Sequence, residues 1–204
     1  KVNDKYYPTE LFLNELVSKE FTKELLDTIK FGLNRFNINF SNKYNGTDFV
    51  LNQKYNYEDV CRLLNWDKNI VALNIGGYKY DEGTNTFPVF INYEKEDDIA
   101  DTIKYEDRFI SQSDLIAISK TGAKTTSAPI KRIYDYKNNG LKIYLFVRKN
   151  KDDNISKEFY FLGEMEPYGS PIGIEMGNTG KTAVEINYKL KETIKEDLYE
   201  YIVN

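Results

Sequence analysis

The stretch Asn74-Ile-Gly-Gly-Tyr-Lys-Tyr-Asp-Glu-Gly-Thr-Asn-Thr-Phe-Pro-Val-Phe-Ile-Asn-Tyr93 predicts a β-hairpin crowded with aromatic rings. Its strands, residues 70–80 and 86–93, would join through a turn at residues 81–85, because Gly and Asn adopt the left-handed dihedrals of a tight turn. The double glycine at 76–77 indicates a bulge or a close approach of the backbone to a ligand. Most of the rings should face the core, since alternate strand positions point inward, and the others could stack on a flat ligand.

Farther along the chain, residues 119–149 are strongly basic. They hold eight Lys and Arg against one acidic residue, a local charge of +7 in a chain of net charge −4. Ser and Thr lie among the basic residues, and these side chains together make most of the phosphate contacts in protein–DNA complexes. The pattern predicts a DNA-backbone surface made of Ser119, Lys120, Lys124, Thr125, Thr126, Ser127, Lys131 and Arg132. A solvated charged surface is the alternative.

The whole chain predicts an α+β fold, a small distorted β-barrel with flanking helices. Seventeen Tyr and twelve Phe favour strands, because aromatic side chains suit a pleated, half-buried surface. Periodicity and cap residues add strands at 114–119, 141–148, 159–165 and 182–188, and helices at 56–66, 129–137 and 195–203. A loop rich in Pro and Gly is expected at 166–180.

Residues 8–36 predict a helical pair, with Ser18 or Thr22 as the cap of the second helix. We therefore divide the chain into a helical arm and connector, residues 1–50, and a domain at residues 51–204. The first residue, Lys1, suggests a piece of a longer protein. There is no signal-peptide pattern and no apolar run near the roughly 20 residues of a membrane helix, so we expect a cytoplasmic location and no membrane partner.

The composition argues against catalysis by this chain. It has no His, the commonest general base, and its one cysteine, Cys61, excludes a Cys-rich zinc site. Residues 180–182 match the end of a phosphate-binding loop, but Glu175 stands where the pattern needs its first glycine. The acidic residues 94–107 are more simply a solvated surface than a magnesium site. We expect no catalytic residue, no metal and no cofactor.

Five segments resemble a C-terminal domain of unknown function that lies behind a phospholipase-D-like nuclease and a superfamily-2 helicase. They are Asp59-Val-Cys-Arg-Leu-Leu-Asn-Trp66, Phe87-Pro-Val-Phe-Ile-Asn-Tyr-Glu-Lys95, Lys104-Tyr-Glu-Asp-Arg-Phe109, Leu145-Phe-Val-Arg-Lys149 and Phe159-Tyr-Phe-Leu-Gly-Glu164. The resemblance, over about residues 52–204, is to the modified-DNA-recognition domain of SauUSI-type type IV restriction enzymes. These ATP-dependent enzymes cut DNA containing 5-methylcytosine, and their recognition domain is similar to SRA-type (PUA-like barrel) domains, which flip the methylated base into a pocket.

The resemblance implies that the partners are double-stranded DNA with 5-methylcytosine or 5-hydroxymethylcytosine and the helicase and nuclease domains of the same polypeptide. A flipped cytosine needs stacking rings and an acceptor for its exocyclic amine. From composition and placement we select Tyr78 and Tyr93 as rings with Trp66 and Tyr105 in reserve, and Asp81, Glu94 or Asp107 as the acceptor. The competing hypotheses are a protein-interaction module that regulates a helicase and a small carboxylate-dependent nuclease.

Overall fold

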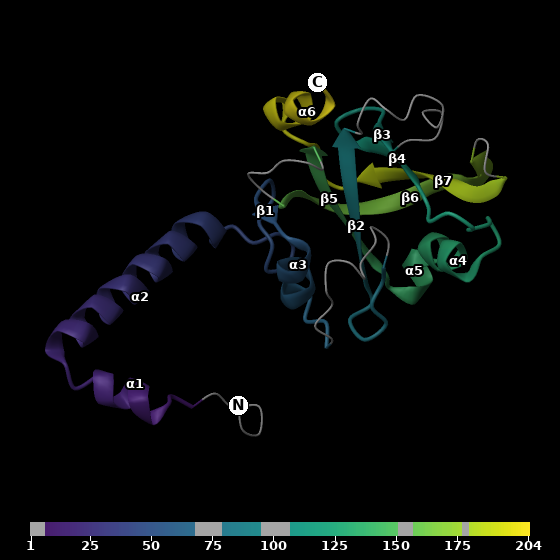
Figure 1. The fold of residues 1–204 in the computed structure, drawn as a ribbon. Coiled ribbons are helices and arrows are strands. Elements are labelled where there is room, and N and C mark those ends of the chain that lie inside the picture. Colours follow the sequence, from purple (N-terminus) through teal and green to yellow (C-terminus); the bar gives the residue numbers. More distant parts are fainter. Residues whose placement is uncertain (1–6, 68–78, 95–106, 151–156, 177–179) are drawn as a thin grey trace. The chain divides into compact units, whose positions relative to one another are not determined.

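A computed structural model describes residues 7–67, 79–94, 107–150, 157–176 and 180–204 (Figure 1). The chain forms two compact units, Lys1–Asn42 and Lys43–Asn204. The first predicted strand of the hairpin, residues 70–80, lies outside the described residues except at its last two positions. Within the described part of the chain, no helix combines the length and the apolar character needed to cross a membrane.

From residue 7 onward, the described part of the first unit contains the helices α1 (Glu10–Glu15) and α2 (Lys19–Phe40). Ser18 begins α2, because its Oγ accepts a hydrogen bond from the Phe21 N–H at 3.3 Å. Such a cap satisfies one of the backbone donors that a helix start leaves unpaired. The predicted helical pair is confirmed, and α2 extends to Phe40, into residues that the sequence assigned to the connector.

The second unit is built on one curled sheet, whose strands follow the order β2-β5-β6-β7-β4-β3, with β1 paired to β6. In Figure 1 the sheet forms an open half-barrel with helices at its sides, which confirms the predicted α+β class. The strands are β1 (Lys54–Tyr55), β2 (Thr86–Glu94), β3 (Arg108–Phe109), β4 (Asp114–Ile118), β5 (Lys142–Asn150), β6 (Phe159–Met176) and β7 (Lys181–Leu190).

Among the described residues, the helices that flank this sheet are α3 (Tyr57–Leu63), α4 (Ala128–Tyr134), α5 (Tyr136–Asn139) and α6 (Glu196–Val203). Asn56 caps α3, because its Oδ1 accepts from the Asp59 N–H at 2.8 Å. Gly140 ends α5 with a left-handed φ of 70°, the conformation that glycine adopts at no steric cost. The sequence predicted both this N-cap and this helix end, and the predicted helices are confirmed.

One strand pairing was not predicted, and one prediction about a loop needs correction. The turn at residues 81–85 is present, closed by a bridge between Asp81 and Thr86, but within the sheet β2 runs parallel to β5, a pairing that the sequence did not indicate. The expected loop at 166–180 is wrong, because β6 continues to Met176 in antiparallel pairing with β7. The register shifts between Tyr168 and Ile172, so the Pro and Gly residues there occupy an irregularity in the ladder, where they are tolerated.

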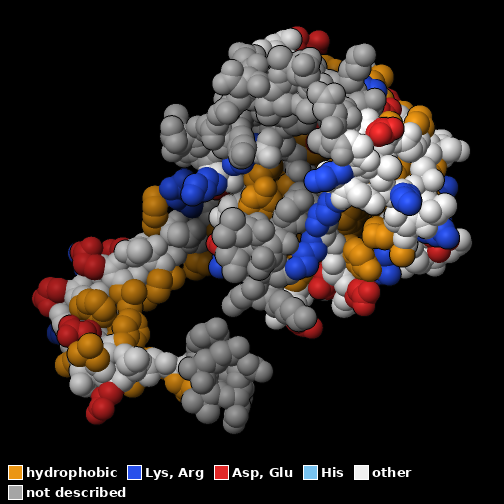
Figure 2. Space-filling model, turned by 45° about the vertical axis from the view of Figure 1, so that its right-hand side comes forward, with side chains coloured by type: hydrophobic (Ala, Val, Ile, Leu, Met, Phe, Trp, Pro, Cys, Tyr) orange, Lys and Arg blue, Asp and Glu red, His pale blue; other side chains and the backbone are white. Residues whose placement is uncertain are grey.

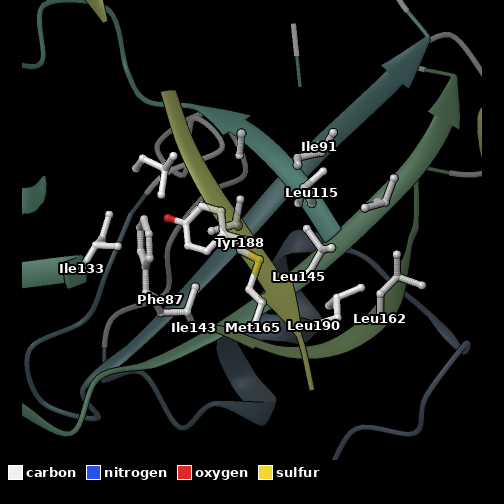
Figure 3. Packing of buried hydrophobic residues seen from close by; sticks show 14 of the residues in the cluster. Phe87, Ile91, Leu115, Ile133, Ile143, Leu145, Leu162, Met165, Tyr188 and Leu190 are labelled. Atoms are coloured by element: carbon white, nitrogen blue, oxygen red, sulfur yellow. The ribbon is translucent and has the colours of Figure 1, made fainter. Parts of the chain in front are cut away.

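Alternation along β5 gives the sheet two different buried faces. Ile143, Leu145 and Val147 join a mostly aliphatic cluster with Met165 and Tyr188, shown in Figure 3. The intervening Tyr144 and Phe146 point to the opposite face, because successive strand residues alternate. There they meet the rings of Phe49, Phe90 and Phe161.

Candidate binding pocket and basic loop

A pocket of about 490 Å³ lies at one end of the aliphatic cluster. Several parts of the chain supply its apolar wall. They include Phe87 from β2, Ala123 from the loop before α4, Pro129, Ile130 and Ile133 from α4, Leu141 before β5, and Ile186 from β7. Figure 3 shows Phe87 and Ile133 close together at one edge of the cluster. The walls are therefore set by the packing of α4 against the curled sheet.

The polar side chains that line this pocket include cations, a carboxylate and two neutral hydroxyls. They are Lys79, Tyr80, Glu82, Ser119, Lys120 and Arg132. Tyr80 connects two of them. Its hydroxyl donates to Glu82 Oε1 at 3.2 Å, and the guanidinium carbon of Arg132 lies 4.5 Å from the centroid of its ring. A half-buried ring, a carboxylate and a guanidinium are thus held together beside an apolar space.

Hydrogen bonds from neighbouring segments fix Arg132. Its Nη2 donates to Asn85 Oδ1 at 2.9 Å, Asn85 Nδ2 donates to the Asn139 carbonyl at 2.6 Å, and Asn139 Nδ2 donates to the Arg132 carbonyl at 2.8 Å. Arg132 Nε is buried and has no hydrogen-bond partner among the described residues. The guanidinium therefore has a fixed orientation, and at least one of its N–H donors has no hydrogen-bond acceptor among the described residues.

The basic loop, residues 119–127, connects β4 to α4 beside the pocket. Ser119 Oγ accepts from the Val184 N–H at 2.8 Å, and Ser127 Oγ accepts from the Lys124 N–H at 2.8 Å, so both hydroxyls shape the loop. The exposed side chains here are those of Lys120, Thr121, Lys124 and Thr126, followed by Lys131 on α4, whereas Thr125 is half-buried. Figure 2 shows Lys and Arg side chains gathered beside hydrophobic ones on one face of the molecule.

Four of the predicted base-pocket residues are described by the structure, and none of them lines this pocket. Trp66 is buried and donates through Nε1 to Thr86 Oγ1 at 2.8 Å, so its ring belongs to the core. Tyr93 stacks on Phe109 with 5.7 Å between ring centroids.

Both described acidic candidates hold the backbone. Asp81 Oδ2 accepts from the Thr84 N–H at 2.8 Å and so stabilises its turn, and Asp107 Oδ1 accepts from the Ile118 N–H at 2.7 Å. Tyr78, Tyr105 and the Glu94 side chain lie outside the described residues.

Sequence reasoning missed the pocket residues Tyr80, Glu82 and Phe87 and treated Arg132 as a backbone contact. The first three lie in or beside the predicted turn, so the hairpin pattern led to the right segment but not to the right side chains. Their common location depends on α4, which follows in the chain only after residue 127. A local pattern contains no signal for that contact.

Burial alters the acidity of several groups in the domain, among them Cys61 and Tyr188. Burial raises the pKa of the Cys61 thiol to about 11, which leaves it protonated and unreactive near neutral pH. Burial, with smaller contributions from Tyr134 and Asp107, raises the pKa of Tyr188. In the part of the chain that the structure describes, no group of three or more Cys, Asp or Glu is placed to hold a metal ion.

Comparison with known proteins gives one family and several remote structural neighbours. Residues 49–202 match the family model described as Domain of unknown function (DUF3427). The DNA modification-dependent restriction endonuclease AspBHI is 13% identical with a TM-score of 0.47, over 76% of this chain and 81% of that protein.

KRYPTONITE in complex with mCHG DNA and SAH is 11% identical with a TM-score of 0.46, over 91% of this chain and 41% of that protein. KRYPTONITE in complex with mCHH DNA, H3(1-15) peptide and SAH is 10% identical with a TM-score of 0.47, over 77% of this chain and 35% of that protein. No curated protein sequence is significantly similar to the chain. Similarities this remote do not by themselves identify a function.

Proposed function

This chain belongs to the family described as Domain of unknown function (DUF3427), and for this member we propose a role as the reader of modified cytosine in double-stranded DNA. The domain binds duplex DNA containing 5-methylcytosine or 5-hydroxymethylcytosine and holds the modified base, flipped out of the helix, in the pocket at Tyr80. The observation that carries the proposal is an apolar pocket of about 490 Å³ whose polar rim adjoins the basic loop. The resemblance of the sequence to SauUSI-type recognition domains supports the same role.

The pocket suits a nucleobase in size and chemistry. Sites for small molecules occupy about 300–1,000 Å³, with mostly apolar walls and a few placed polar groups, and this pocket falls within that range. A flipped base loses stacking in the duplex and regains it against aromatic or apolar side chains. Tyr80 and Phe87 are the rings available for this among the described lining residues.

Recognition of cytosine needs an acceptor for its exocyclic amine, and we assign that role to Glu82. Its carboxylate lines the pocket, whereas Asp81, which we expected to act, is engaged in its turn. Discrimination of the methylated base rests on the apolar wall. One methyl group contributes only about 1–3 kcal/mol in a hydrophobic pocket, so the preference over plain cytosine is modest.

The basic loop supplies the contacts to the DNA backbone. Lys120 lines the pocket and is exposed, and Lys124, Thr126 and Lys131 extend the surface away from it. Phosphates on either side of a flipped nucleotide lie close to the base, so a cationic loop beside the pocket is placed to neutralise them. Such contacts fix the position on the duplex without recognising the sequence.

The domain itself is not catalytic in this proposal. It delivers modified DNA to the helicase and nuclease domains of a longer, ATP-dependent type IV restriction enzyme, and the two-helix unit at Lys1–Asn42 joins it to them. The alternative is a protein-interaction module without DNA affinity. Its basis is the exposure of the basic side chains, which a merely solvated surface would also show.

Fluorescence anisotropy with matched duplexes tests the proposal. One duplex carries a central 5-methylcytosine, one 5-hydroxymethylcytosine and one unmodified cytosine, each titrated at two salt concentrations. We expect tighter binding to the modified duplexes, together with a rise in the fluorescence of a 2-aminopurine placed beside the modified base, which reports loss of stacking. Equal affinity for all three duplexes without a 2-aminopurine change, or no binding, would favour the protein-interaction module.

A further inference from the structure

We infer that Arg132 is a specificity-determining residue, which donates hydrogen bonds to the acceptor edge of the flipped base and so distinguishes 5-methylcytosine from thymine. This inference rests on the proposed function and replaces the phosphate contact that the sequence suggested for Arg132. It starts from a chemical problem. Thymine carries the same C5 methyl group as 5-methylcytosine. A pocket that recognised only the methyl group would therefore also bind thymine, a normal base of DNA.

The surroundings of Arg132 differ from those of a phosphate-binding side chain. Lys120, Lys124 and Lys131 are exposed, as contact with a duplex backbone requires. Arg132 is half-buried, lies against the face of Tyr80 and lines the pocket. A guanidinium in that position faces a ligand inside the pocket rather than a phosphate on the outside.

Arg132 is also held in one orientation, which recognition of a base edge requires. The bond from Nη2 to Asn85 Oδ1 and the stacking on Tyr80 together fix the plane of the guanidinium. A planar group with five N–H donors keeps donors for a ligand after one is used by Asn85. Lysine, with a flexible stem and a rotating ammonium, could not present donors in one plane.

Tyr80 brings a donor and an acceptor to the same ligand. Its ring contacts Arg132 and its hydroxyl contacts Glu82, so both charged groups lie beside one ring. Cytosine presents an amine donor at C4 next to an acceptor at N3, which matches a carboxylate and a guanidinium. Thymine presents an acceptor at C4 next to an N–H donor at N3. Its acceptor would face the carboxylate and its donor would face the guanidinium, so neither could form a hydrogen bond.

The unpaired Arg132 Nε agrees with a functional role. A buried donor without an acceptor lowers stability, and such a group in a native protein calls for an explanation. Packing alone would be served by an apolar side chain at this position. Donation of hydrogen bonds to a ligand would explain why a costly arginine stands in the wall of the pocket.

Competition binding with three variants tests the inference. The duplexes carry either 5-methylcytosine or thymine opposite guanine. Each variant is compared with the parent chain on the same two duplexes, so that the difference in the free energy of opening the two base pairs cancels. Arg132→Ala and Arg132→Lys should narrow the preference for 5-methylcytosine over thymine by on the order of 10- to 100-fold. The neighbour Lys131→Ala should weaken both duplexes equally and leave the preference intact, because it contacts only phosphate.

Arg132→Lys keeps the charge and separates the two roles. If Arg132 recognises the base, this variant loses the preference while the dependence of affinity on salt is unchanged. If Arg132→Ala instead weakens both duplexes equally and flattens the salt dependence, Arg132 is a phosphate contact and the inference fails. If the parent chain does not distinguish methylated from unmethylated duplexes, the proposed function fails first. Thermal melting of each variant checks that it is folded.

Discussion

The two faces of strand β5 bury different kinds of side chain, aromatic on one face and mostly aliphatic on the other. On one face, Phe146 and Tyr144 pack into a cluster of rings, in which Phe161 lies 4.9–6.1 Å from the centroids of four others. On the other face, Ile143 and Leu145 join aliphatic residues whose cluster ends at the pocket. The described pocket lies on the aliphatic face.

In this domain the dense cluster of rings and the described pocket therefore lie on different faces of β5. Aromatic side chains pair with one another at centroid distances of about 4.5–7 Å, so a segment rich in them tends to pack against itself. The pocket lies where α4 meets the sheet.

The largest effect should come from the aromatic face. Phe161→Ala removes a fully buried ring that contacts four others, and we expect the free energy of unfolding to fall by about 3–5 kcal/mol. Urea unfolding followed by circular dichroism measures it. The control is Tyr168→Ala, whose ring is 43% exposed and whose loss should change stability by less than about 0.5 kcal/mol. Similar losses for both variants would mean that the ring cluster is not a principal part of the core.

The pocket face should show a loss of binding rather than of stability. Tyr80→Ala should reduce the affinity for methylated duplex by about 1–3 kcal/mol, the contribution of base–aromatic stacking, and the stability by only about 0.5–1 kcal/mol through the lost cation–π contact with Arg132. Tyr80→Phe, which keeps the ring and loses only the bond to Glu82, should retain most of the affinity. Isothermal titration calorimetry measures both variants, and undiminished binding by Tyr80→Ala would place the base elsewhere.

A smaller change of opposite sign is expected inside the aliphatic cluster. Tyr188 is fully buried, and its hydroxyl has no hydrogen-bond partner among the described residues; in Figure 3 the hydroxyl lies on the side of Phe87. Because burial of an unpaired hydroxyl is unfavourable, Tyr188→Phe should raise the free energy of unfolding by about 1 kcal/mol. A loss of stability in chemical denaturation would reveal a partner for this hydroxyl.

The same residue predicts behaviour at high pH. Burial raises the folded pKa of Tyr188 above its ordinary value of 10.0 and raises that of Tyr144 to about 12. The stability that depends on these neutral phenols is therefore fully present below pH 10 and decreases as pH rises from 10 toward 12. Melting temperatures across this interval should fall, and less steeply for Tyr188→Phe than for the parent chain. If the melting temperatures of Tyr188→Phe and the parent chain fell equally steeply with pH, the raised pKa of Tyr188 would not contribute to the loss of stability.

The smallest effect concerns the basic loop. Lys120→Ala and Lys124→Ala should each reduce the slope of log affinity against log salt by about 0.9, because each phosphate contact releases condensed counterions. Lys195→Ala, an exposed lysine just before α6, should leave the slope unchanged. If the loop variants behave like this control, the DNA backbone binds at another surface.

The sequence by itself determined the features that depend on neighbouring residues. The caps at Ser18 and Asn56, the helix end at Gly140 and the alternation along β5 are local, since each depends on side chains within a few residues of the backbone they affect. The charge of residues 119–149 is likewise a property of composition alone.

Only the tertiary structure decided which residues line the pocket. The parallel pairing of β2 with β5 and the bond between Arg132 and Asn85, which are 47 residues apart, join segments that no local pattern connects. For the same reason Trp66 was expected near the ligand and lies in the core, where Thr86, 20 residues away, accepts its indole N–H. A side chain's neighbours across the fold depend on how whole elements pack, and that packing minimises exposed apolar area over the entire domain rather than within any one segment.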